Sequence, residues 1–161
     1  MKRILVILGL TYFFFLLEFL LFNTFGRWGK PGLLIILIVF LNLYLGIRYG
    51  LICAVLSGIL KDAFSFEIFG VYIFLYMSSA FLAIILRRNF YRPGSQLSRL
   101  VVTSGVLLFF FLGQVVLYAM NADIDFKGSV QFVFLPEALA TLVCATFFFQ
   151  KLKLLADKIR L

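Results

Sequence analysis

Three carboxylates lie within or beside long apolar segments, and these residues are the best placed in the chain to do chemistry. Glu18 lies late in a run of Phe and Leu, Asp62 ends an apolar segment, and Glu137 follows Pro136. Two intramembrane carboxylates can form an aspartic-protease site when one is protonated and the other is ionised. This chain has a single Asp within its apolar segments, without the Asn- and Gly-rich surroundings of such enzymes. We therefore predict that the protein is not an enzyme.

Metal and cofactor sites of the usual kinds are not indicated either. The chain has no His and two Cys, and Cys53 and Cys144 lie in separate apolar segments without CxxC spacing. Structural zinc, haem and iron–sulfur sites depend on such ligands. We expect no metal and no cofactor, and we interpret both cysteines as small packing residues.

Asp62 also has a structural interpretation. A carboxylate that faces lipid is costly, so Asp62 should face protein or water. It can cap or orient a helix end by pairing with Lys61, Lys30 or a backbone amide. Binding to a partner protein is the functional alternative.

Glu18 and Pro136 allow similar interpretations. Glu18 can reach toward the outer interface, near Asn23 and Arg27, or it can make a contact across helices or to a partner subunit. Pro136 is predicted to begin or kink the last helix, because proline is tolerated in a first turn. Glu137 then lies where the helix dipole favours an acid.

The composition requires a membrane environment for the elements that carry these residues. Hydrophobic residues make up 64% of the 161 residues and charged residues only 14%. A spanning helix needs about 20 mostly apolar residues. We predict an all-α membrane protein with one integral membrane domain over residues 1–161 and six spans at about 4–22, 33–47, 51–66, 71–86, 100–120 and 130–149. The first is interpreted as a retained helix, because no small-residue cleavage site follows it.

The second and third spans are short, and one of them need not cross completely. A tight turn is predicted between them at Arg48-Tyr49-Gly50. A stripe of small residues with a carboxylate at its end follows at steps of four, which predicts close helix contact. Its members are Gly46, Gly50, Ala54, Gly58 and Asp62.

The basic residues predict the topology. With both termini in the cytoplasm, eleven of the 15 Lys and Arg residues fall on the cytoplasmic side, as the positive-inside rule requires. These are Lys2, Arg3, Arg48, Arg87, Arg88, Arg92, Arg99, Lys151, Lys153, Lys158 and Arg160, against Arg27, Lys30, Lys61 and Lys127 outside. The net charge of +8 is thereby explained without a nucleic-acid partner, and it favours contact with anionic lipid headgroups.

The order of short motifs resembles that of the MreD family of bacterial rod shape-determining membrane proteins. The order is Pro31, an apolar span, Arg48-Tyr49-Gly50, Gly58-x-x-x-Asp62, Gly70 and a basic loop. The segment Pro136-Glu137-Ala138-Leu139-Ala140-Thr141-Leu142 is similar to the proline-containing final helix of that family. The resemblance covers most of the chain, although Phe often replaces Leu.

The resemblance implies a non-enzymatic scaffold or regulatory subunit of the cell-wall elongation machinery in the bacterial inner membrane. It implies binding to MreC and, through MreC, an indirect link to MreB, RodA and a class B penicillin-binding protein. It also implies a fold similar to the substrate-binding component of energy-coupling-factor transporters, so a vitamin-binding transporter subunit is the alternative function. Carried over to this chain, Gly58, Asp62 and Gly70 shape the third and fourth helices, and Glu18 and Pro136 are further candidates for partner-binding or structural roles.

Overall fold

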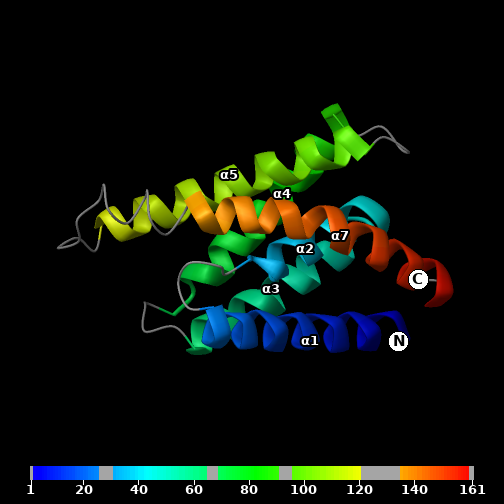
Figure 1. Ribbon diagram of the computed structural model, residues 1–161, viewed down its shortest axis with the longest axis horizontal. Helices are drawn as coiled ribbons and strands as arrows, with labels where there is room; N and C mark the ends of the chain where they lie inside the picture. The colour runs from blue at the N-terminus through cyan, green and yellow to red at the C-terminus, as the bar shows by residue number, and fades with distance from the viewer. Residues whose placement is uncertain (1, 26–30, 65–68, 91–95, 121–134, 160–161) are drawn as a thin grey trace.

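The computed structural model describes residues 2–25, 31–64, 69–90, 96–120 and 135–159, and it is helical throughout these ranges apart from short turns. The six helices there follow the order and positions of the six predicted segments (Figure 1). They are α1 (Lys2–Phe25), α2 (Leu33–Tyr44), α3 (Ile47–Phe64), α4 (Val71–Phe90), α5 (Gln96–Met120) and α7 (Leu135–Ile159). The beginning of the predicted sixth span, at residues 130–134, lies outside the described residues.

Three helices in the described part of the chain are long and apolar enough to cross a membrane. The candidate segments are Ile4–Thr24 in α1, Val71–Phe90 in α4 and Leu97–Val116 in α5. Helix α2 is apolar but has only 12 residues. At 1.5 Å per residue it extends about 18 Å, well short of a hydrocarbon core of about 30 Å. The prediction of a short second helix is confirmed, whereas α3, with 18 residues, is longer than predicted. Six complete crossings stay a prediction.

Helix α2 is the centre of the bundle. Every residue from Leu33 to Leu43 is buried, and α2 contacts α1, α3, α4, α5 and α7. Its sequence LLIILIVFLNLY is apolar on all sides, which is the pattern of a helix surrounded by other helices. The remaining helices are arranged around it, with α1 and α5 along opposite edges and α7 across the middle of the view (Figure 1). Helix α7 also meets α1, because the rings of Phe148 and Phe14 are in contact.

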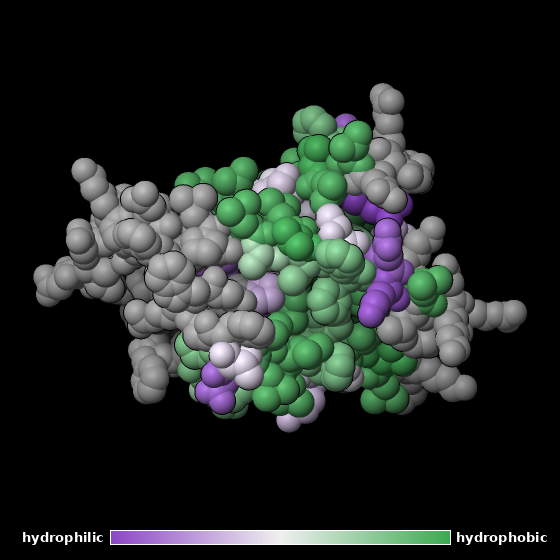
Figure 2. Space-filling view, in the orientation of Figure 1, coloured by the Kyte–Doolittle hydropathy of each residue, from purple (hydrophilic) through white to green (hydrophobic). Residues whose placement is uncertain are grey.

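Helix α1 buries one stripe and exposes the rest of its surface. Ile7, Thr11, Phe14 and Glu18 are buried at helical spacing, whereas Phe13 is 57% exposed. Figure 2 shows that hydrophobic side chains dominate the coloured part of the face in view. An apolar exterior of this kind is expected where lipid is the solvent.

The turn between α2 and α3 differs from the sequence prediction. It lies at Leu45 and Gly46, and Arg48-Tyr49-Gly50 belongs to the first turns of α3. Gly46 has φ +98°, a left-handed conformation that glycine adopts readily, and its N–H donates to the Leu41 carbonyl oxygen over 3.0 Å. Gly46 therefore ends α2 and is not part of the small-residue stripe.

The rest of the stripe lies on α3 as predicted and permits close approach of its neighbours. Gly50, Ala54, Gly58 and Asp62 are all buried. A Cβ atom at Gly58 would overlap with the backbone of Ile73 in α4, and one at Gly50 would overlap with the Asn42 side chain in α2. The absence of side chains at these two glycines thus allows α3 to pack against both helices.

Gly58→Ala should lower the free energy of unfolding by about 1–3 kcal/mol, because the new methyl group meets backbone that cannot move aside easily. Gly9→Ala in α1 is the matched control, since nothing lies within 4 Å of a Cβ at Gly9. Removing an interior helical glycine there should be neutral or stabilising by up to about 1 kcal/mol. Thermal melting of the detergent-solubilised variants, followed by circular dichroism, checks both. Equal melting temperatures for the two variants would contradict the close α3–α4 contact.

Candidate functional site

Polar side chains from three helices meet near the beginning of α2, the end of α3 and the beginning of α4. We call this group the polar cluster and define it as Glu18 of α1, Lys61 and Asp62 of α3, and Thr141 of α7. Lys61 and Asp62 are consecutive, so their side chains point about 100° apart around α3. As a result, Lys61 reaches α1 while Asp62 reaches α4.

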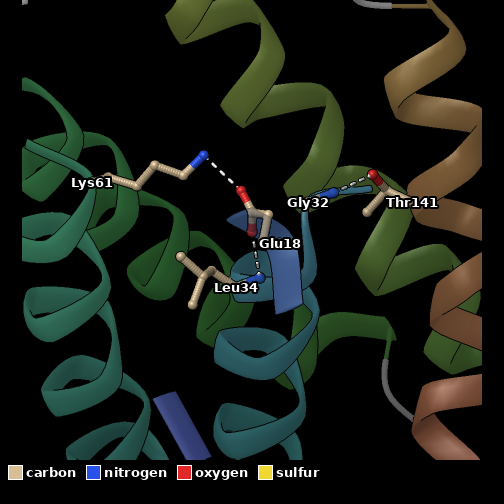
Figure 3. Close-up of polar contacts among 5 residues, drawn as sticks. All are labelled: Glu18, Gly32, Leu34, Lys61 and Thr141. Carbon is tan, nitrogen blue, oxygen red and sulfur yellow. Dashed lines mark hydrogen bonds and ion pairs between the residues drawn. The ribbon is translucent and has the colours of Figure 1, made fainter. Parts of the chain in front are cut away.

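Glu18 and Lys61 form a buried ion pair between α1 and α3. Lys61 Nζ lies 2.6 Å from Glu18 Oε1, and the two side chains are only 17% and 4% exposed, respectively (Figure 3). Lys61 Nζ also lies 5.8 Å from the centre of the Tyr72 ring, within the range of a cation–π contact. Each charge is costly to bury alone, so each helix supplies the group that the other needs.

The other oxygen of Glu18 serves the beginning of α2. Its Oε2 accepts a hydrogen bond from the Leu34 N–H over 3.3 Å, and Thr141 Oγ1 accepts one from the Gly32 N–H over 2.9 Å (Figure 3). The Thr141 hydroxyl itself donates to the Glu137 carbonyl oxygen. The first N–H groups of a helix have no partner within the helix. Side chains from α1 and α7 therefore complete the beginning of α2.

The charges at the two ends of α2 match its dipole. A helix favours an anion near its first turn and a cation near its last turn. Glu18 occupies the first position, and Arg87 of α4 occupies the second, where its Nη1 donates to the Asn42 carbonyl oxygen over 2.8 Å. The side-chain amide of Asn42 also donates to the Ala80 carbonyl oxygen. Both ends of the short central helix are thus held by neighbouring helices.

Asp62 caps α4 across the turn that precedes it. Its carboxylate accepts hydrogen bonds from the N–H groups of Gly70, Tyr72 and Ile73 over 3.0, 3.0 and 3.2 Å. Gly70 has φ +104°, a conformation that a side chain would strain, and this turns the chain into α4. Of the alternatives left open by the sequence, the structure shows the backbone-amide contact.

The Gly-x-x-x-Asp motif therefore has a physical explanation. Residues four apart lie on one face of a helix, one turn from each other. Gly58 lets α4 approach at Ile73, and Asp62 binds the N–H groups of the same turn of α4. Close approach and capping depend on each other, because the carboxylate reaches these N–H groups only when the helices are near.

The other candidate residues are also placed by the structure. Glu18 makes the contact across helices that the sequence left as one of its alternatives, and Pro136 lies in the first turn of α7. Arg27 and Lys30, considered as partners for the two carboxylates, lie outside the described residues. The roles of Glu18, Asp62 and Pro136 in partner binding stay predictions.

Three contributors were not identified from the sequence: Lys61 as the partner of Glu18, Arg87 at the end of α2, and Thr141. The pairing of Lys61 with Glu18 had a signal in the sequence, because these oppositely charged residues lie at similar predicted depth in the first and third apolar segments. The contacts of Arg87 and Thr141 had no such signal, since basic residues after a span and threonines within a span are common. Only the packing of α4 and α7 against α2 shows what they bind.

The chemistry of the polar cluster is hydrogen bonding and charge pairing within the protein. Both oxygens of Glu18 have donors, and both oxygens of Asp62 accept backbone N–H groups. An acid–base pair for hydrolysis needs carboxylates that can exchange protons with water and substrate. In the observed contacts these carboxylates instead hold helices together. Among the described residues, no group of three or more His, Cys, Asp or Glu is placed to hold a metal ion.

These features define a helical membrane protein whose buried charges serve its own architecture. A family model described as "rod shape-determining protein MreD" matches residues 1–159, nearly the whole chain. The chain therefore belongs to the MreD family, as the order of its motifs indicated. This family consists of shape-determining membrane proteins and is not a known enzyme family. No curated protein and no solved structure matches the chain.

Lys61→Met should lower the free energy of unfolding by about 3–5 kcal/mol, because Glu18 is left buried and unpaired. Glu18→Gln should cost less, because the long Lys61 side chain can move toward the interface. The double variant should recover most of the loss, since the amide introduced by Glu18→Gln keeps an acceptor for the Leu34 N–H and no charge remains. Unfolding of the four proteins in mixed micelles measures the coupling. Additive losses in the double variant would show that the two residues do not act as a pair.

Asp62→Ala should expose the first turn of α4. Removing a helix cap costs about 0.5–2 kcal/mol, and loss of several N–H contacts places this change at the upper end. Asp62→Asn keeps one acceptor oxygen and should lose less. Hydrogen exchange of the amides of Tyr72 and Ile73 should accelerate in the order wild type, Asn, Ala. Exchange that speeds up throughout the bundle, and not first in α4, would argue against a capping role.

Proposed function

We propose that this protein is a non-enzymatic scaffold of the bacterial inner membrane that binds MreC and supports rod shape through peptidoglycan synthesis. The observation that carries the proposal is the family match over residues 1–159. That family belongs to the shape-determining system that also includes MreC and MreB. The indirect partners would be MreB, RodA and a class B penicillin-binding protein.

The polar cluster supports a scaffold in preference to a catalyst. Its carboxylates are engaged by Lys61 and by backbone N–H groups, so they hold α1, α2, α3 and α4 in one arrangement. A scaffold needs surfaces of fixed shape, and buried polar contacts between helices supply the necessary order. In this proposal the partner contacts the outer surface of the bundle, while the charged groups of the polar cluster remain inside.

The proposed topology places the termini together in the cytoplasm. Helix α1 begins and α7 ends at the same end of the molecule (Figure 1), which agrees with an even number of crossings. Arg87, Arg88 and Arg99 lie near that end of the bundle, in the last turn of α4 and the first turn of α5. The polar cluster would then lie toward the outer side of the membrane. The family match supports the scaffold function and not the transporter alternative.

Affinity purification of the tagged protein from native membranes should recover MreC, identified by mass spectrometry. Asp62→Ala should reduce the recovery of MreC several-fold, because a misplaced α4 alters the surface that the partner contacts. Gly9→Ala should leave it unchanged. Photocrosslinking residues placed at Phe13, Phe74 and Leu108, which are exposed on α1, α4 and α5, would identify the contacting helix. Recovery of ATPase subunits with a bound small molecule, and of no MreC, would instead establish the transporter function.

A further inference from the structure

A small cavity with both polar and apolar walls lies between α5 and α7, away from the polar cluster. It measures about 60 Å³ and is lined by Arg99, Leu100, Thr146, Phe149 and Gln150. Arg99 lies in the first turn of α5, whereas Thr146, Phe149 and Gln150 lie near the middle of α7.

Arg99 is the group in this cavity that lacks a partner. Its Nε atom is buried and has no hydrogen-bond partner among the described residues. A buried donor without an acceptor carries a free-energy cost, and a guanidinium prefers a planar, doubly accepting anion. The described residues that line the cavity include no carboxylate. Because Nε is itself buried, a group bound in the cavity would meet the terminal N–H groups of the guanidinium.

The remaining walls fit an anion of a few atoms. Gln150 is exposed and offers a side-chain amide, whereas the Thr146 hydroxyl already donates to the Val143 carbonyl oxygen over 2.7 Å. Phe149 is 4% exposed and forms an apolar wall. One water molecule needs only about 10–15 Å³. A cavity several times larger accommodates a group of the size of a phosphate.

The surroundings of the cavity favour a phosphate that is attached to acyl chains. The neighbouring turns of α5 and α7 expose large apolar side chains: Leu97 is 75% exposed, Val101 50%, Val143 59% and Phe147 67%. Such surfaces contact lipid tails, while the charged head of the arginine stays at headgroup depth. The predicted topology places Arg99 at the cytoplasmic leaflet, where anionic lipids attract basic residues.

We propose that Arg99 and Gln150 form a binding site for the phosphate of an anionic phospholipid headgroup, with its acyl chains along α5 and α7. A lipid headgroup and free phosphate share the same chemistry here, because in both a phosphate oxygen accepts a hydrogen bond from the guanidinium. This site is separate from the contacts that support the proposed scaffold function, so either proposal can fail alone.

Native mass spectrometry of the detergent-solubilised full chain tests the proposal, with phosphatidylglycerol as the probe and phosphatidylcholine for comparison. The wild type should retain one phosphatidylglycerol in preference to phosphatidylcholine. Arg99→Gln should weaken retention about tenfold, because a charge-assisted hydrogen bond is lost. Lys151→Gln removes an exposed cation next to Gln150 without touching the cavity, and it should change retention less than about twofold.

Two further measurements complete the test. Arg99→Lys keeps the charge without the forked donors and should give intermediate retention, which provides a result even if the Gln variant does not fold. Millimolar inorganic phosphate should not displace the lipid; displacement would overturn the lipid assignment in favour of free phosphate. The site itself would be refuted by wild-type retention in both Arg99 variants, or by an equal loss in Lys151→Gln.

Discussion

A short apolar helix buried on every side has to find partners for the polar groups at its ends, and α2 shows how this protein meets that requirement. Its 12 residues do not reach across a membrane, so at least one end lies where water is scarce. Glu18 and Thr141 bind its first N–H groups, and Arg87 binds a carbonyl near its last turn. Because these side chains belong to α1, α7 and α4, completing α2 also fixes three surrounding helices.

The end of α3 connects this requirement to the rest of the bundle. Lys61 neutralises the carboxylate that serves α2, and the next residue, Asp62, caps α4. Gly58, one turn earlier, brings α4 close enough for that cap. Two consecutive charged residues thus link α1, α2, α3 and α4. The cost of burying each charge is offset because every one of them meets a group of opposite charge or a backbone dipole.

This arrangement agrees with membership of a family that is defined by its role in cell shape and not by an enzymatic reaction. Its charged residues are used to position its own helices, which leaves an apolar exterior for lipid and for other membrane helices. Fold alone does not establish function, so the scaffold proposal depends on the family match and on partner recovery. The cavity at Arg99 has a different character, because there a buried donor lacks a partner within the described part of the chain.

The helical membrane class, the positions of the helices, the short second helix and the stripe on α3 could all be predicted from the sequence, since these depend on local hydropathy and on spacing. The sequence also limited the possible partners of Asp62 to a few groups, among them the backbone amides that the structure shows. The folded arrangement was needed to show that Glu18 pairs with Lys61, that Arg87 and Thr141 bind α2, and that the hairpin turns at Gly46 and not at Arg48-Tyr49-Gly50. The physical reason is that apolar runs report burial but not direction around a helix. In lipid almost every face is apolar, so the periodicity that would identify the neighbours is weak.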